Sequence, residues 1–320
     1  MINFRYHVVS LTAVFLALAV GLVLGSTVLN GPMLDALNSQ VNTLGRDNKQ
    51  LREQVSFLEE ESQRDQDYAA ESAPMMLDGR LTDRRILLVV LPTGEEYAEG
   101  VAQNLELAGA TVTGQVQLLD KFVHPAHRLT ELLDLAHQVL PGSVPAAGLP
   151  ANSDGVETSA ALLAAVLLDG DGAEPVPDGD RRSVLSAYTA ADYLTVVDDT
   201  VSGPAEAIVV VAGLPESDTD ADDKNEAMLT AVVQFGQAAP TVVAGAGVSG
   251  DGNVVAEVRR DPILSTTIAT VDNAATPQGQ VATGLVVSDR LARGTVSHHG
   301  LGDGAASLLP QLVTPAEATP

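Results

Sequence analysis

Two pairs of histidines are the side chains of this chain best suited to hold a transition metal. His124 and His127 lie three positions apart, so both rings face one side if a helix begins at Pro125. His298 and His299 are adjacent, and Asp303 follows them in a glycine-rich segment. Imidazole is the commonest metal ligand among side chains. The two pairs are therefore the candidate metal ligands, and the alternative is that these histidines are surface or capping residues.

A glycine-rich loop follows one of the expected strands. Residues 245–250 read Gly-Ala-Gly-Val-Ser-Gly and match G-x-G-x-x-G, the pattern of dinucleotide-binding loops. Such a site also needs a helix directly after the loop and an acid about 20 residues further on. Gly252 and Asn253 make a poor helix start, and residues 263–265 contain no acid. We interpret the loop as a flexible surface turn, and the sequence identifies no certain cofactor.

A run of acids has the spacing of the first ligands in a calcium-binding loop. The run consists of Asp218, Asp220 and Asp222, but position six is Asp223 instead of glycine and position twelve is Leu229 instead of glutamate. A solvated acidic loop is the better interpretation. The sequence also contains neither G-x-S-x-G nor H-E-x-x-H. We expect a protein that is not an enzyme and assign no catalytic residue.

Charge and composition restrict the partners of the chain. Asp and Glu number 42 against 17 Lys and Arg, for a formal net charge of −25. Such a surface repels phosphates, so we expect no nucleic-acid partner. The absence of cysteine excludes disulfides and thiolate metal sites. Aromatic residues make up only 3% of the chain, too few for the two belts of an outer-membrane barrel.

The elements that position these residues begin with an apolar segment. Residues 8–29 contain no charge and, at about 1.5 Å per residue, suffice to cross a hydrocarbon core of roughly 30 Å. Arg5 precedes the segment, so residues 1–7 are expected in the cytoplasm and the bulk of the chain outside it. The run exceeds the apolar region of a cleaved signal peptide, which is the alternative. We expect a single-pass protein of the cell membrane.

A heptad repeat follows over residues 33–64. Leucine occupies every d position, and the a positions starting at Leu34 carry valine twice and asparagine once. An asparagine pair hydrogen-bonds across the axis only in a parallel two-stranded register. The predicted dimer seam is Leu37, Val41, Leu44, Asn48, Leu51, Val55 and Leu58. We expect a homodimer; the alternative is an amphipathic helix that packs on its own globular domain.

Beyond a polar hinge at residues 65–85, residues 86–310 are expected to form an extracytoplasmic domain before a tail at 311–320. Most of its strands are unbroken apolar runs, which indicate burial on both faces of a parallel sheet. The expected strands are residues 86–91, 111–118, 208–211, 241–244 and 267–271. The expected helices are residues 95–107, 126–140, 159–168, 183–193, 226–238 and 277–287. This alternation predicts a doubly wound, mostly parallel α/β domain.

Several segments resemble the actinobacterial copper transport protein B family, MctB, along nearly the full length. The opening Asn-Phe-Arg-Tyr-His-Val-Val-Ser-Leu at residues 3–11 carries most of the resemblance, together with residues 16–25, 85–91, 265–273 and 279–281. The resemblance implies an envelope protein that helps to export copper, with a proposed pore in the outer membrane. It also implies a link to envelope integrity and daughter-cell separation, together with a membrane partner.

The residues favour the second of these implications over the first. A single apolar helix without a polar stripe suits an inner-membrane anchor better than a pore. Imidazole suits Cu(II), whereas Cu(I) prefers thiolates and clustered thioethers, and the chain has no Cys and 5 Met. The resemblance supplies no residue-by-residue set of copper ligands. The sequence therefore leaves two functions open, copper efflux and homeostasis, or a non-enzymatic coiled-coil scaffold that acts with an envelope or division membrane protein.

Overall fold

The computed structural model describes residues 4–150, 154–169, 175–197 and 201–311, with the side chains of residues 26–34 left undescribed. The chain divides into two units, residues 1–65 and 66–320, and each is treated by itself. Most of the expected tail at 311–320 lies outside the described residues.

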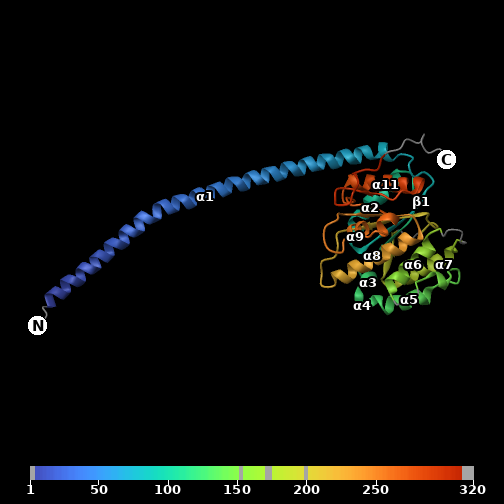
Figure 1. Cartoon of the computed structure of the whole chain (residues 1–320), viewed down its shortest axis with the longest axis horizontal. Coiled ribbons are helices and arrows are strands. Elements are labelled where there is room, and N and C mark those ends of the chain that lie inside the picture. The colour runs from blue at the N-terminus through green and yellow to red at the C-terminus, as the bar shows by residue number, and fades with distance from the viewer. Residues whose placement is uncertain (1–3, 151–153, 170–174, 198–200, 312–320) are drawn as a thin grey trace. The chain divides into compact units, whose positions relative to one another are not determined.

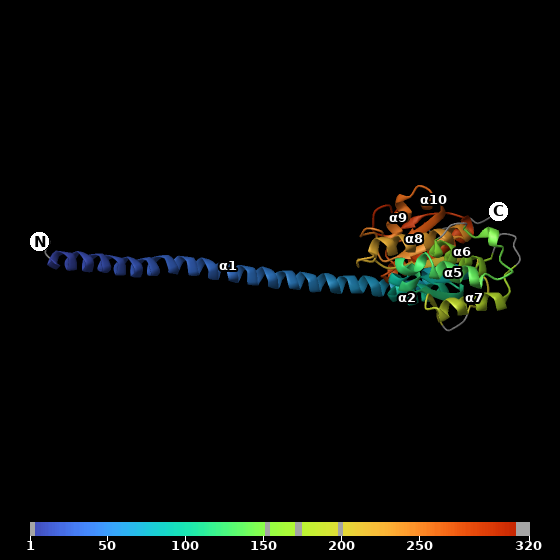
Figure 2. The ribbon, with the colours of Figure 1, turned by 90° about the horizontal axis from the view of Figure 1, so that it is seen from below.

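Helix α1 runs from Phe4 to Leu77 and provides all of the described structure of the first unit (Figures 1 and 2). Its span Phe4–Gly25 is long and apolar enough to cross a membrane, and none of that span is buried within the protein. The range expected from the sequence, residues 8–29, overlaps this span. An uninterrupted apolar helix near the N-terminus is therefore present.

The segment predicted as a polar hinge, residues 65–85, is helical up to Leu77. Helix α1 continues through Pro74 to Leu77, and a turn at residues 78–84 follows. Ala69, Ala73 and Leu77 recur at four-residue spacing and are buried in the second unit. Proline costs a helix one backbone hydrogen bond. Here that bond lies in the last turn, where burial of the apolar face offsets it.

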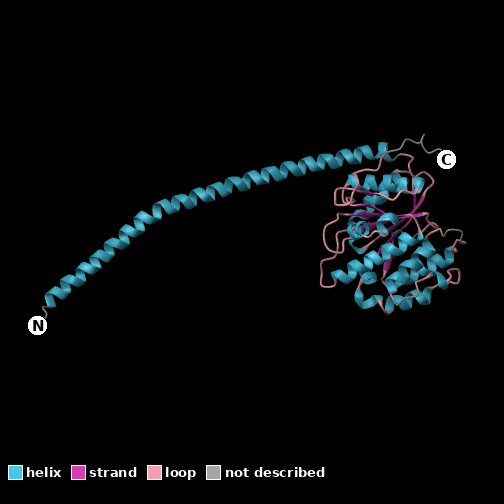
Figure 3. Ribbon diagram, in the orientation of Figure 1, coloured by secondary structure: helices cyan, strands magenta, loops and turns pink. Residues whose placement is uncertain are grey.

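The second unit is built on a central sheet, drawn in magenta in Figure 3. Within the described residues the sheet has seven strands in the order β3-β2-β1-β4-β5-β6-β7. Every neighbouring pair is parallel except β2 and β3. The strands are β1 Arg85–Val90, β2 Thr111–Leu118, β3 Leu194–Val196, β4 Ala207–Ala212, β5 Thr241–Gly245, β6 Ile268–Val271 and β7 His298–His299. The predicted mostly parallel α/β class is confirmed.

Helices cover both faces of this sheet. Helices α2 and α11 lie on one face, and α5 to α8 lie on the other (Figure 1). The helical elements are η1 Pro92–Gly94, α2 Glu95–Leu107, α3 Asp120–Val123, α4 Pro125–Arg128, α5 Glu131–Val139, η2 Ala146–Gly148, α6 Gly155–Leu167, α7 Asp178–Ala190, α8 Ala221–Ala238, α9 Val254–Arg260, α10 Leu264–Thr267 and α11 Pro277–Arg293.

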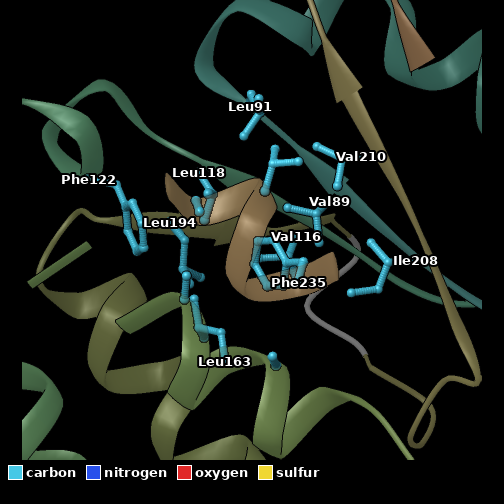
Figure 4. Packing of buried hydrophobic residues seen from close by; sticks show 14 of the residues in the cluster. Val89, Leu91, Val116, Leu118, Phe122, Leu163, Leu194, Ile208, Val210 and Phe235 are labelled. Carbon is cyan, nitrogen blue, oxygen red and sulfur yellow. The ribbon is translucent and has the colours of Figure 1, made fainter. Parts of the chain in front are cut away.

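Strand β1 shows why its sequence is continuously apolar. Leu87 and Val89 belong to the hydrophobic cluster that contains Phe235 of α8, whereas Ile86 and Leu88 belong to the cluster on the opposite face. Figure 4 shows the first of these clusters, where Val89 and Phe235 lie among side chains from several elements. Successive side chains of a strand point to opposite faces, so a central strand with two buried faces is apolar at every position.

The helix predicted over residues 126–140 is two helices, α4 and α5, with a break at Leu129 and Thr130. The start of α6 approaches this break so closely that a Cβ atom on Gly155 would clash with the carbonyl oxygen of Arg128. A tertiary contact divides the helix here, and no local sequence signal does. The periodic pattern of residues 126–140 therefore does not reveal the break.

Candidate functional site

The order of the strands reverses between β1 and β4, the position where doubly wound sheets commonly bind ligands. In this protein the backbone segments that follow β1 and β4 pack against each other at this position. The amide of Gly213 donates a hydrogen bond of 3.0 Å to Thr93 Oγ1, and a Cβ atom on Gly213 would clash with the Thr93 carbonyl. Gly94 lies equally close to the backbone of β4. Glu95 and Glu96 in the first turn of α2 also oppose an anion at this helix end.

The glycine-rich loop at residues 245–250 connects β5 to α9. Asn253, judged a poor helix start from the sequence, is in fact the N-cap of α9, and its side chain accepts a hydrogen bond from the amide of Ala256 at 3.1 Å. Gly250 has a positive φ of 95°, and its Cα lies against the ring of Pro215. The glycines of the loop therefore permit a close approach between two loops of the sheet edge.

His298 and His299 form β7 at the edge of the sheet and are both held by neighbouring groups. His298 Nδ1 lies 2.9 Å from Thr270 Oγ1, and its Nε2 lies 3.0 Å from the carbonyl oxygen of Ser265. The two ring nitrogens of His299 each lie 3.1 Å from a serine hydroxyl. Adjacent residues of a strand point to opposite faces. The structure does not bring these two rings together.

Burial also governs the protonation of this pair. It lowers the pKa of His298 below the ordinary value. The hydrogen bond that the ring donates to the carbonyl oxygen of Ser265 opposes this shift, and the charges of Arg259 and His299 lower the pKa further. Burial likewise lowers the pKa of His299. The folded protein therefore favours the neutral imidazole at both positions.

A buried ion pair fixes the segment around β7. Arg259 Nη1 lies 2.7 Å from Asp272 Oδ2, and the two side chains are 4% and 2% exposed. The carboxylate of Asp272 also accepts the amides of Leu301 at 2.7 Å and Gly302 at 2.9 Å. Arg259 donates further to the carbonyl oxygen of His299. The sequence reasoning missed this network, although Asp272 lies in a segment that carries the family resemblance.

The structure does bring His124 and His127 together. Their ring centroids are 5.6 Å apart. His124 caps α4 by accepting the amide of Ala126 at Nδ1, and its Nε2 lies 3.7 Å from Asp220 Oδ2. His127 Nδ1 lies 3.0 Å from Glu131 Oε2. Each ring of this pair thus faces one carboxylate, and the capping interpretation holds for His124.

Lys224 forms an ion pair with Asp218, the first acid of the run after β4. Lys224 Nζ lies 2.6 Å from Asp120 Oδ1 and 2.8 Å from Asp218 Oδ2. These hydrogen bonds raise the pKa of Lys224, and the bond from Lys224 lowers the pKa of Asp218. Asp222 lies in the first turn of α8, where a negative charge stabilises the helix. Across the described part of the chain, no three His, Asp or Glu side chains are grouped as a metal-ion site.

The predicted dimer residues lie on α1 within the first unit. The six apolar members are between 51% and 65% exposed in the single chain, and Asn48 is exposed as well. They are Leu37, Val41, Leu44, Leu51, Val55 and Leu58. Exposed leucine and valine at heptad spacing form the stripe that a second helix would cover.

Comparison with known proteins identifies relatives along the whole chain. The family described as copper transport outer membrane protein, MctB, matches residues 1–310. The copper transporter MctB of Mycobacterium tuberculosis H37Rv is 30% identical over 319 residues, which cover 96% of this chain and 99% of that protein. The copper transporter MctB of Mycobacterium leprae is 29% identical, over 97% of this chain and 100% of that protein. The chain therefore belongs to the MctB family of copper transport proteins.

Proposed function

We propose that this protein is a membrane-anchored envelope protein that lowers the copper content of the cell. The family match over residues 1–310 carries the proposal. The apolar span Phe4–Gly25 supports an anchor in the cell membrane, and Arg5 before it favours an extracytoplasmic location for the bulk of the chain. In this arrangement the α/β unit acts outside the cytoplasm.

The functional form proposed is a parallel homodimer joined through the heptad stripe. The exposure of its leucines and valines in the single chain supports this form, because an exposed apolar stripe is unfavourable in water. Asn48 would pair with its copy across the axis.

The pair His124 and His127 is proposed as the place where Cu(II) contacts the chain. The two rings lie close together, each beside a carboxylate, and imidazole and carboxylate oxygen both bind Cu(II). His298 and His299 fit this role less well, because adjacent residues of β7 point to opposite faces of the strand and their rings do not converge.

The test is a deletion strain of the source organism challenged with copper. Cell copper, measured by mass spectrometry, is expected to rise on deletion and to return to the parental value with the full chain. The double variant His124→Ala with His127→Ala should restore less, whereas the matched variant His137→Ala on α5 should restore fully. Unchanged cell copper on deletion would overturn the proposed function.

A scaffold that acts with a membrane partner in envelope integrity and cell separation is the second candidate. The exposed heptad stripe favours it, because such a stripe serves association rather than metal chemistry. If the protein is a scaffold, its deletion should give chained cells whose copper content equals that of the parent strain. If it is a transporter, its deletion should raise the copper content.

The role of Asn48 is tested by Asn48→Val in the full chain. The variant should retain a coil but lose its single register or oligomeric state, because valine has no directional partner across the axis. Cysteine introduced at Leu37, a d position of the seam, reports the register by disulfide trapping, and light scattering reports the mass. A strictly dimeric mass with an unchanged trapping pattern would refute the role of Asn48.

A further inference from the structure

Three loops at the carboxyl edge of the sheet present apolar side chains to solvent. Leu214, after β4, is 52% exposed and Leu301, after β7, is 76% exposed. Val248, after β5, is partly exposed between them. Leu214 lies against Gly247, and Val248 packs on Gly302. Leu214, Val248 and Leu301 therefore form one continuous surface, termed here the edge surface.

Buried polar side chains hold the loops of the edge surface in place. Asn225, which is 3% exposed, accepts the amide of Glu216 at 2.9 Å and donates to the carbonyl oxygen of the same residue at 3.2 Å. Asp272 accepts the amide of Leu301, and Arg259 donates to the carbonyl oxygen of Asp303 at 3.0 Å. Loops fixed in this way cannot withdraw their leucines into the core. A preorganised surface of this kind loses little entropy when it binds a partner.

The edge surface is bordered by negative charge. Asp251 and Asp303 are exposed at its margin, and Glu216 is partly exposed beside Pro215. The neighbouring cations are turned inward, because Lys224 pairs with two aspartates and Arg259 pairs with Asp272. The margin is therefore acidic around an apolar centre.

We propose that the edge surface docks a basic segment of another protein, which contacts Leu214 and Leu301 through an apolar side chain. Its Lys or Arg residues meet Asp251 and Asp303. A second copy of this chain is disfavoured, because it carries a formal net charge of −25 and would bring the same acids. An anionic lipid surface is disfavoured for the same reason. This inference goes beyond the proposed function and requires no copper.

The test uses the full chain in phosphatidylcholine nanodiscs, with a photo-cross-linking benzoylphenylalanine in place of Ser249, beside Val248. The probes are three biotinylated peptides of equal length, which alternate Lys with Leu, Glu with Leu, and Lys with Ser. The Lys–Leu peptide should cross-link about ten-fold more than either of the others, because it alone offers both positive charge and apolar contact. The same cross-linker at Ile263, a residue 73% exposed outside the edge surface, is the matched control position.

Substitutions in the edge surface test which side chains contact the Lys–Leu peptide. Leu301→Ser should lower cross-linking of the Lys–Leu peptide by about ten-fold, as for a central contact residue. Asp251→Asn with Asp303→Asn should lower it further at low salt and flatten its salt dependence. Circular dichroism verifies the fold of each variant, and these side chains are exposed, so folding should be retained.

Four outcomes would overturn the proposal. Equal yields at Ser249 and Ile263 would show that the peptide adheres without a site, and an unchanged yield in Leu301→Ser would remove the apolar contact. A cross-link from position 249 to a second copy, in preference to the peptide, would assign the edge surface to self-association. Preferential cross-linking to phosphatidylglycerol in mixed nanodiscs would assign it to lipid.

Discussion

The same side-chain types have opposite surroundings in the two units of this protein. Leu51 of the heptad stripe is 60% exposed, whereas Leu88 of β1 is fully buried. The second unit covers the apolar side chains of its sheet with its own helices, on both faces. In the single chain, the described leucines and valines of the stripe are exposed. The apolar side chains of the α/β sheet are therefore covered within one chain, whereas the stripe is the place where a second helix is proposed to pack.

This difference assigns different tasks to the two units. Polar groups inside the α/β unit, such as Arg259 and Asp272, serve to fix its own loops. The one polar residue of the stripe, Asn48, would serve instead to select a partner register. Changes to the α/β unit should therefore act on folding, and changes to the stripe should act on association.

The largest effect is expected from breaking the buried ion pair. Asp272→Ala should lower the free energy of unfolding of the α/β unit by about 3–5 kcal/mol, because it leaves Arg259 buried without its carboxylate partner. Glu257→Ala, which removes the more exposed ion pair with Arg260, is the matched control and should cost less than about 1 kcal/mol. Denaturant unfolding followed by tyrosine fluorescence measures both. Equal losses would mean that the Asp272 network does not support the unit.

The next prediction tests the comparison directly. Leu88→Ala should lower the stability of the α/β unit by about 2–5 kcal/mol at every protein concentration, because it leaves a cavity. Leu51→Ala should leave that unit unchanged and instead weaken the helical signal of α1 on dilution, as expected for a dissociating coil. Circular dichroism over a hundred-fold concentration range separates the two behaviours. A concentration-independent effect of Leu51→Ala would favour packing of the helix on its own domain.

The sequence predicted those parts of the fold that carry a local signal. The runs that became β1, β4 and β5 are continuously apolar because both faces of these strands are buried. By contrast, β7 consists of His298 and His299 alone, and its register depends on pairing with β6. No local pattern marks a polar strand of two residues, so β7 was missed.

In the candidate sites, too, the sequence predicted only the arrangements that arise from residues close together in the chain. The spacing of His124 and His127 correctly placed the two rings side by side. Nothing in the spacing of Arg259 and Asp272 indicates their pairing, which the return of the chain from α9 to β6 brings about. The available signal was an acid, Asp272, directly after the apolar strand expected at residues 267–271. The continuation of α1 past Pro74 was missed because its apolar face is formed by small alanines within a polar segment.

A smaller effect is expected from pH. Burial lowers the pKa of His298 and of His299, so between the folded and unfolded pKa values the unfolded chain binds more protons. The stability of the α/β unit should therefore be highest above about pH 6.5 and fall as the pH drops below that value. His298→Gln should reduce this fall, whereas His137→Gln on exposed α5 surface should leave it intact. Denaturation midpoints at pH 8 and pH 5 provide the measurement, and identical pH slopes in both variants would contradict the assignment.

The smallest effect is expected at the start of α9, where the glycine-rich loop meets a helix. Asn253→Ala removes the side-chain oxygen that accepts the amide of Ala256, and it should cost about 1 kcal/mol of stability. Asn253→Ser retains a side-chain oxygen as acceptor without placing a charge at this buried position, and it should preserve most of that stability. A loss confined to the alanine variant would show that the loop is held by its cap. Equal stability of all three proteins would mean that the glycine contacts alone hold the loop, and the rigidity of the edge surface would then rest on Asn225 and Asp272.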